Sequence, residues 1–84
     1  MRIHKDQVAD VEVMTLNDDE SSNVKEASYH FDDATLYINF KGGGVYSYFA
    51  VPASTWEGLK SAESKGRYFS SSIKGYYLFK RMDK

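Results

Sequence analysis

The sequence predicts a single α+β domain, in which an antiparallel β-meander is packed on one face by two short helices. Three observations lead to this fold class. Apolar and polar side chains alternate through most of residues 24–49, as they do in half-buried strands. The spacing changes to a helical one after Val51-Pro52. The length of 84 residues suits one small domain with a thin core.

Two strands are expected in the first third of the chain. Residues 8–16 predict one strand and residues 24–31 predict another, with a polar loop at 17–23 between them. In the second strand His30 is expected to face solvent. The side chains that share one side of the first strand are Val11, Val13 and Thr15, and those that share the core face of the second are Ala27, Tyr29 and Phe31.

Residues 36–40 and 45–49 predict the strands of a hairpin that is joined through three glycines. A two-residue loop would place Leu36, Ile38 and Phe40 beside Val45, Ser47 and Phe49. A three-residue loop, Gly42–Gly44, places them beside Tyr46 and Tyr48. The longer loop is favoured, because it builds one continuous apolar face and because glycine suits the left-handed residue of such loops.

The first helix is expected over residues 53–62. Pro52 is predicted at its first helical position, where the missing N–H costs nothing. The residues of its inner face recur at three-residue steps and are Trp56, Leu59 and Ala62.

A second, short helix is expected to begin after Ser64, a residue type that caps helices well. Gly75 is placed like a helix stop, and residues 76–81 have the composition of a strand that rejoins the sheet. One core is predicted, to which Phe79 is also assigned. Its members are Leu36, Ile38, Phe40, Tyr46, Trp56, Leu59, Phe69 and Ile73.

Composition excludes several classes of protein. Hydrophobic residues make up 42% and charged residues 27%, which is ordinary for a globular chain and excludes a disordered one. Cysteine is absent, so disulfides and thiolate zinc sites are excluded. No apolar run approaches the roughly 20 residues of a membrane helix, and the opening residues do not resemble a signal peptide. We therefore expect a cytoplasmic protein with no membrane partner.

Charge is distributed unevenly along the chain. Residues 1–20, expected to form an N-terminal strand and an acidic segment, carry a net charge of −4, and residues 21–84 carry +3. From Lys65 onward the balance is +5. A basic surface attracts anionic partners, and the acidic segment would weaken that attraction if it folded back. The alternative is a solvated tail beside a solvated face.

Residues 21–82 resemble the KTSC domain family. The residues that carry the resemblance are Ser22, Leu36, Phe40, Tyr46-x-Tyr48, Val51-Pro52, the run Ala62-x-Ser64-Lys65-Gly66-Arg67-Tyr68-Phe69, and Ile73. The resemblance implies a compact domain of a sheet and helices. The family is named for its occurrence at the C terminus of some lysyl-tRNA synthetases, and it also occurs as stand-alone bacterial and phage proteins.

The start of the second helix is the first candidate site. Free N–H groups and the helix dipole favour anions there, and Ser64-Lys65-Gly66-Arg67 adds two cations and a glycine. A hypothesis that competes with this one is structural: Ser64 caps the helix, Gly66 relieves crowding and the two cations are solvated.

Basic and aromatic residues also interleave near the C terminus, as they do in proteins that hold single-stranded nucleic acid by charge and by stacking. Core packing of the tyrosines is the competing interpretation; Tyr68, Tyr76 and Tyr77 are the ones expected to be exposed. The complete set of candidate binding residues is Ser64, Lys65, Gly66, Arg67, Tyr68, Lys74, Tyr76, Tyr77, Lys80 and Arg81.

Motifs for catalysis and metal binding are weak. His4 and His30 are the only histidines, and Asp18, Asp19 and Glu20 lack the spacing of a calcium loop. The glycine run at 42–44 lacks the P-loop pattern. We therefore predict a non-enzymatic binding module with no cofactor and no metal, whose partner is RNA or single-stranded DNA. The alternative is a protein-interaction module, for example a phage-encoded modulator of a host complex.

Overall fold

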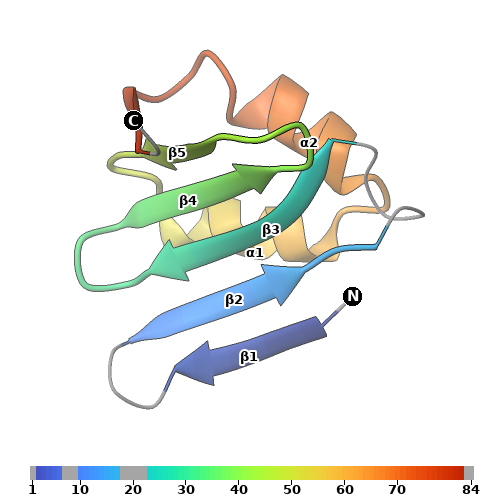
Figure 1. Cartoon of the computed structure of the whole chain (residues 1–84). Helices are drawn as coiled ribbons and strands as arrows, with labels where there is room; N and C mark the ends of the chain where they lie inside the picture. Colours follow the sequence, from blue (N-terminus) through green and yellow to red (C-terminus); the bar gives the residue numbers. More distant parts are fainter. Residues whose placement is uncertain (1, 7–9, 18–22, 83–84) are drawn as a thin grey trace.

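A computed structural model describes residues 2–6 by their backbone, and residues 10–17 and 23–82 with their side chains. It contains one antiparallel sheet in the order β1-β2-β3-β4-β5-β6 and two helices (Figure 1). The strands are β1 (Arg2–Asp6), β2 (Val11–Thr15), β3 (Val24–His30), β4 (Thr35–Phe40), β5 (Val45–Tyr48) and β6 (Phe79–Arg81); the helices are α1 (Ala53–Ser61) and α2 (Lys65–Ser72). The predicted fold class is confirmed, including the C-terminal strand.

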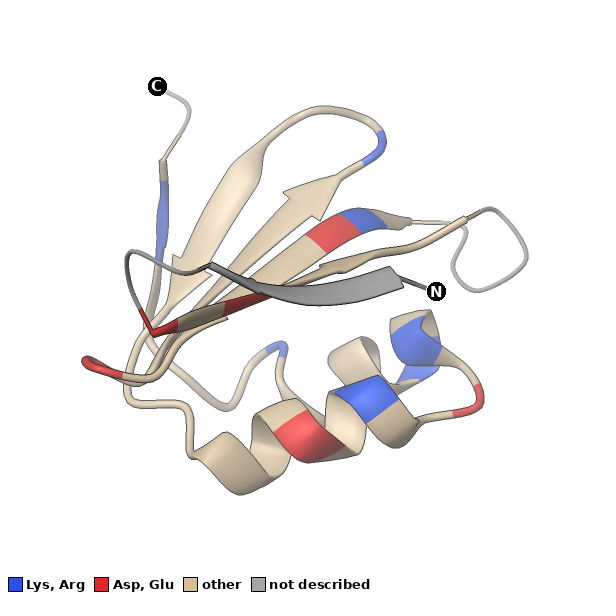
Figure 2. Ribbon diagram, turned by 90° about the horizontal axis from the view of Figure 1, so that it is seen from below, with Lys and Arg blue, Asp and Glu red and all other residues tan. Residues whose placement is uncertain are grey.

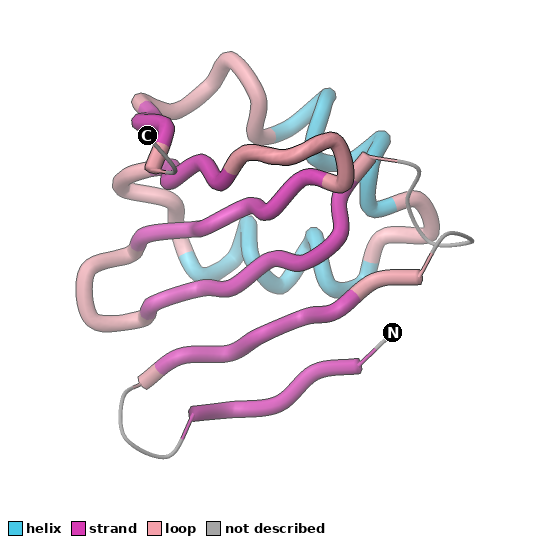
Figure 3. The backbone as a smooth tube through the Cα atoms, in the orientation of Figure 1, coloured by secondary structure: helices cyan, strands magenta, loops and turns pink. Residues whose placement is uncertain are grey.

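Both helices lie on the same face of the sheet, as Figures 1 and 3 show. The chain leaves the sheet after β5, forms α1 and α2, and returns as β6 beside β5. The loop after α2 therefore lies next to the last strands of the sheet. The face of the sheet that carries the helices holds the core, and the other face, called the open face below, carries neither α1 nor α2.

Two rows of side chains cross the sheet on the helix side, because directly paired residues of antiparallel strands point to the same face. The first row is Glu12, Tyr29, Leu36, Tyr48 and Phe79. The second row is Met14, Ala27, Ile38, Tyr46 and Arg81. Both rows are apolar in the middle of the sheet and carry a charged residue at one end.

The first predicted strand is observed as β2, which is shorter than predicted. Val11, Val13 and Thr15 share one side of β2 as predicted, and that side is the open face. Glu12 and Met14 face the helices, and Met14 is fully buried. The strand begins at Val11 and is preceded by β1, a strand that periodicity did not predict; residues 8 and 9 lie outside the described residues. Because the charged residue Glu12 lies on the core side of β2, the sequence does not show a regular alternation of apolar and polar residues there.

The hairpin between β4 and β5 has the predicted facing but a different loop. Leu36 pairs with Tyr48, and Asn39 pairs with Val45. The Phe40 N–H donates to the Gly44 carbonyl at 3.1 Å, so the three-residue loop is 41–43 rather than 42–44. The observed pairing of β4 with β5 is thus shifted by two residues from the predicted pairing. Because side chains alternate with a period of two, each still points to the predicted face of the sheet. Positive φ angles at Gly43 and Gly44, 99° and 104°, explain why glycine is needed there.

The helix boundaries agree with prediction to within a residue or two. Pro52 has ψ 149°, so it is the N-cap of α1 and not its first helical residue. Ser64 caps α2 as predicted, accepting a hydrogen bond from the Arg67 N–H at 3.3 Å. The helix ends at Ser72, and Gly75 takes a positive φ of 86° in the turn that follows. Gly75, predicted as the helix stop, therefore belongs to that turn and not to the end of the helix.

The predicted core is confirmed for every member except Phe79. Trp56, Leu36, Ile38 and Ile73 are fully buried, while Phe40 and Tyr46 are half-buried at the margin of the same cluster. Phe79 is 58% exposed. Its assignment to the core was wrong because β6 is a three-residue edge strand, and only the side of the ring toward β5 is covered.

A polar cluster ties α1 to the sheet beneath it. Trp56 stacks on Tyr29 with ring centroids 5.7 Å apart, and its indole N–H donates to a Glu12 oxygen at 2.8 Å. The Lys60 ammonium donates to the same oxygen at 2.7 Å and lies 3.0 Å from Glu57. The Tyr29 hydroxyl donates to the Val51 carbonyl. These contacts fix the helix over the sheet.

Three groups of the folded domain hold their protons more tightly than usual. Burial raises the pKa of the Tyr29 hydroxyl and that of the Tyr48 hydroxyl. Burial lowers the pKa of the Lys60 ammonium, but hydrogen bonds to Glu12 and Glu57 outweigh it, so the net pKa is raised.

We expect the free energy of unfolding to fall as the pH rises above about 10, where these groups titrate in the unfolded chain. A raised folded-state pKa stabilises the fold fully below the unfolded pKa, and that contribution is lost as the pH passes through the folded value. Urea unfolding at a series of pH values tests this. Tyr29→Phe should flatten the alkaline decline relative to the unaltered chain. An identical slope in Tyr29→Phe would contradict the assignment.

Candidate functional site

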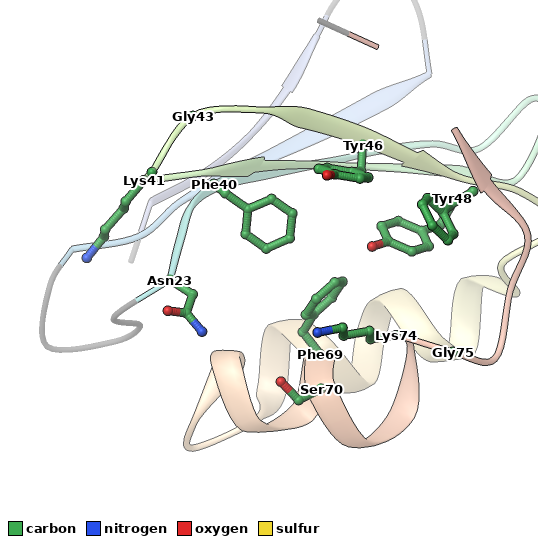
Figure 4. A pocket seen from close by; sticks show the side chains of 12 residues that line it. Asn23, Phe40, Lys41, Gly43, Tyr46, Tyr48, Phe69, Ser70, Lys74 and Gly75 are labelled. Atoms are coloured by element: carbon green, nitrogen blue, oxygen red, sulfur yellow. The ribbon is translucent and has the colours of Figure 1, made fainter. Parts of the chain in front are cut away.

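A pocket of about 510 Å³ opens between the β4–β5 hairpin on one side and the end of α2, the loop after it and β6 on the other (Figure 4). Five of the twelve residues that line it are aromatic, and the others are glycines and polar residues. The lining residues are Asn23, Phe40, Lys41, Gly42, Gly43, Tyr46, Tyr48, Phe69, Ser70, Lys74, Gly75 and Phe79.

The five rings form a closed circuit of contacts, which we call the aromatic circuit. Phe40 contacts Tyr46 and Phe69, with centroid distances of 5.5 Å each. Phe79 contacts Tyr46 at 5.7 Å and Tyr48 at 5.6 Å, and Tyr48 contacts Phe69 at 5.5 Å. Edge-to-face and tilted contacts of this kind are favourable ring geometries. Each ring is therefore positioned by two others before any ligand arrives.

Sequence alternation explains the circuit on the sheet side. The core residue Leu36 faces the helices and pairs directly with Tyr48. Because side chains alternate between the two faces along a strand, Phe40, four residues after Leu36, and Tyr46, two residues before Tyr48, face the helices as well. Phe69 comes from the inner face of α2. Burial, with a contribution from nearby Tyr46, raises the pKa of the Tyr48 hydroxyl, which therefore stays protonated at neutral pH.

The two stretches of chain that supply nearly all of the pocket lining carry charges of one sign. From Ala34 to Trp56 Lys41 is the sole charged residue, and from Ser64 to Met82 five residues are basic and none is acidic. In Figure 2 the hairpin of β4 and β5 and the stretch from α2 to β6 accordingly carry blue but no red. In Figure 4 the Lys74 side chain runs toward Phe69 along the α2 side of the pocket.

Arg81 adds a third cation on the sheet side. Its guanidinium lies 5.8 Å from the centre of the Tyr46 ring, the separation of a cation–π contact. Residues 34–56 and 64–82 supply every lining residue except Asn23. An anionic ligand in the pocket would therefore meet cations on both sides and no carboxylate from those two stretches.

The start of α2 does not have the arrangement that an anion site requires of Lys65. We expected this side chain to point outward, but it is buried, and its ammonium donates to the Ala62 carbonyl at the end of α1. Such a contact satisfies a terminal helix carbonyl and joins the two helices. Ser64 acts as the cap, and Arg67 is exposed. The structural interpretation is therefore confirmed for Ser64, which caps the helix, but it is wrong for Lys65, whose side chain is buried and not solvated.

Two of the three tyrosines expected at the surface are half-buried. Tyr68 packs over α1 where Gly58 leaves room: a Cβ at Gly58 would lie 2.2 Å from the tyrosine oxygen. The Tyr77 hydroxyl lies 3.2 Å from the Thr55 hydroxyl, which attaches the loop after α2 to α1. Tyr76 alone is exposed as expected, at 69%. Tyr68 is a packing residue because α1 and α2 approach each other closely at Gly58, and Tyr77 is one because the loop after α2 lies against α1.

Of the ten candidate residues, Lys74 lines the pocket and Arg81 stacks on one of its walls. Lys80 is exposed on the open face, opposite Ser47, on the other side of the sheet from the pocket. Gly66 is half-buried in the first turn of α2. The sequence interpretation missed the five rings as a site, because the same alternation that builds a core also lines a pocket.

Among the described residues, no three His, Asp or Glu side chains gather closely enough to hold a metal ion. No helix in the same residues is long and apolar enough to cross a membrane. His30 lies on the open face as predicted, with its ring in edge contact with Tyr37 at 4.6 Å.

Fold and pocket together define a small α+β domain with an aromatic pocket bordered by cations. The model of the KTSC domain matches residues 20–77, and the chain belongs to the KTSC domain family. The family resemblance seen in the sequence is thereby confirmed. Met14 and Leu16 belong to the core as well, so the sheet continues beyond the N-terminal end of the matched range.

Relatives include both long and short proteins. The chain is 41% identical over 75 residues to a lysine–tRNA ligase of Nostoc punctiforme, a match covering 89% of this chain and 13% of the ligase. An uncharacterized protein of Stutzerimonas stutzeri is 32% identical, with 76% of this chain and 92% of that protein covered. The chain thus corresponds to a small part of the ligase and to nearly all of the short relative.

The fold also matches a solved structure. The crystal structure of a KTSC domain protein from Yersinia pestis superposes with a TM-score of 0.78 at 32% identity, covering 86% of this chain and 97% of that one. This chain therefore shares its fold with a KTSC domain protein of known structure.

Proposed function

We propose that this domain is a non-enzymatic module that binds single-stranded nucleic acid, RNA or DNA, through the aromatic pocket and the cations around it. The observation that carries the proposal is the combination of a closed aromatic circuit with basic residues on both of its sides. Bases of an unpaired strand stack on aromatic rings, and its phosphates are neutralised by Lys and Arg. Double-stranded nucleic acid does not offer unstacked bases to such a pocket.

The relatives add an associational argument. Three of them are lysine–tRNA ligases, proteins that by name act on an RNA. The segment they share with this chain is 13% of their length, so the argument concerns the appended domain and not the ligase reaction. A nucleic-acid-binding domain would serve such a protein by holding its substrate.

A protein-interaction module is the second candidate, and a specific observation favours it. Several large apolar side chains are exposed around the edge strand β6, namely Phe49, Tyr76, Leu78, Phe79 and Met82. Exposed apolar residues that gather in one place mark surfaces that contact other proteins. The salt dependence of binding separates this candidate from the first.

We expect a labelled single-stranded oligonucleotide to bind at low salt and to be released steeply as salt is added. Three phosphate contacts, by Lys41, Lys74 and Arg81, give a log–log slope of about −2 and a loss of affinity of about 20-fold from 50 to 200 mM salt. Fluorescence anisotropy with RNA and DNA at both salt concentrations measures this.

Lys74→Ala and Lys80→Ala form a matched pair for the same assay, since both remove an exposed lysine. Lys74 lines the pocket and Lys80 lies on the open face. Lys74→Ala should reduce the slope by about 0.7 and Lys80→Ala should leave it nearly unchanged. Absence of binding to either nucleic acid at 50 mM salt would reject the proposal and favour the protein-interaction module.

A further inference from the structure

We infer that the aromatic pocket binds one nucleotide as a unit, with the base against the Phe79 ring and the phosphate at the Lys74 ammonium. The inference rests on the proposed function, and it specifies the ligand class: a nucleoside monophosphate, either free or as one unstacked nucleotide of a strand.

The pocket has the size of a small-molecule site. Its volume of about 510 Å³ lies within the range of about 300–1,000 Å³ that ligand-binding cavities have. Its wall is mostly apolar and aromatic, with a few polar side chains such as Asn23 and Ser70 at one side. Figure 4 shows the Phe40 ring pointing into the space between the hairpin and α2. A planar ligand of the size of a nucleotide fits this description.

Phe79 is the most exposed ring of the circuit. Phe79 touches Tyr46 and Tyr48 and nevertheless leaves 58% of its surface to solvent. A base that stacks on this ring would bury apolar area that the fold itself leaves exposed. Phe40, Tyr48 and Phe69 are more deeply packed and act as the supporting wall.

The charge selects among ligands that an aromatic pocket would accept. Circuits of aromatic rings also bind organic cations through their π faces. Here Lys74 lines the pocket and the Arg81 guanidinium already lies over Tyr46, so a cationic ligand would be repelled. A planar group that carries negative charge is favoured instead. Among biological ligands, a nucleotide joins these two features in one molecule.

We test the inference by NMR titration of the whole chain with AMP, adenosine and inorganic phosphate. AMP should shift the amide signals of residues that line the pocket, such as Gly43, Ser70 and Gly75. Adenosine and phosphate should each bind more weakly than AMP, because each lacks half of the recognised chemistry. The same samples are then titrated with a short single-stranded oligonucleotide.

Phe79→Ala is expected to weaken AMP binding about 5- to 150-fold, the range of one base–ring stack. Tyr76→Ala is the matched control, because Tyr76 is an exposed aromatic residue outside the pocket lining. Lys74→Ala should weaken AMP and leave adenosine unchanged. Phe79→Leu, which keeps an apolar side chain without a ring, distinguishes stacking from packing. The NMR spectrum of each variant verifies that it is folded.

The possible outcomes separate this inference from the proposed function. If the oligonucleotide binds but AMP shifts no pocket signal and Phe79→Ala has no effect, the inference is rejected and the proposed function stands. If AMP binds as described and the oligonucleotide does not, the pocket is a site for free nucleotides and the proposed function is rejected. If AMP and the oligonucleotide both bind, and the same substitutions weaken both, the pocket binds one nucleotide of a strand, and both proposals are supported. Binding of neither rejects both.

Discussion

Replacement of Trp56 by alanine is expected to lower the free energy of unfolding by about 3–5 kcal/mol, as truncations of large buried aromatic residues do. The indole is fully buried, stacks on Tyr29 and hydrogen-bonds to Glu12. Alanine would leave a cavity between α1 and the sheet and remove the stack as well. A domain of this size has little stability to spare, so much of the Trp56→Ala protein is expected to be unfolded at 37 °C.

Urea denaturation followed by circular dichroism measures the Trp56→Ala loss. Tyr76→Ala is the control, since an exposed ring with no assigned packing role should change stability by less than about 0.5 kcal/mol. A loss below about 1 kcal/mol for Trp56→Ala would mean that the indole is not a packed core residue, and the inner face of α1 would then be assigned wrongly.

Glu12→Ala is expected to cost about 2–3 kcal/mol, the second-largest effect we predict. One carboxylate oxygen accepts from both the Trp56 indole at 2.8 Å and the Lys60 ammonium at 2.7 Å. Its removal leaves a buried indole N–H without this acceptor and reduces the contacts of a largely buried ammonium. Buried donors that lose their partner bear the desolvation penalty in full.

Two matched variants isolate the role of Glu12 in the same denaturation assay. Glu12→Gln keeps an oxygen acceptor and should lose less than Glu12→Ala. Glu57→Ala removes the exposed partner of Lys60 and should cost less than about 1 kcal/mol, as exposed ion pairs do. An equal loss in Glu12→Ala and Glu57→Ala would contradict the assignment of the indole hydrogen bond as the main contribution.

The candidate site was predictable only in part. Lys74 and Arg81 were singled out because basic and aromatic residues interleave near the C terminus, and both lie at the pocket. Lys65 was singled out for the same positive charge, yet its ammonium binds a helix carbonyl. A side chain's type indicates which interactions it makes. Whether its partner is a ligand or the protein depends on which atoms the fold brings within reach.

The rings of the pocket also show what the sequence could not predict. Phe40, Tyr46 and Tyr48 were correctly placed on one face of the sheet, and this face was interpreted as core. Period-two alternation predicts the direction of a side chain but not what covers it. The position of α2 and the path of the loop after it decide that these rings line an opening, and Phe79 became part of it because β6 has no neighbour on its outer side.

The sequence by itself determined the antiparallel meander, the two helices and the inward direction of Trp56, Leu59, Phe69 and Ile73, because local periodicity and capping chemistry specify these features. Only the tertiary structure decided which face of β2 is covered, which of the tyrosines are exposed and where the rings leave a space. Each of these depends on contacts between residues far apart in the chain, such as Glu12 with Trp56 and Phe79 with Tyr48. Local sequence patterns contain no information about which distant residues come into contact. The candidate binding site is formed by such long-range contacts.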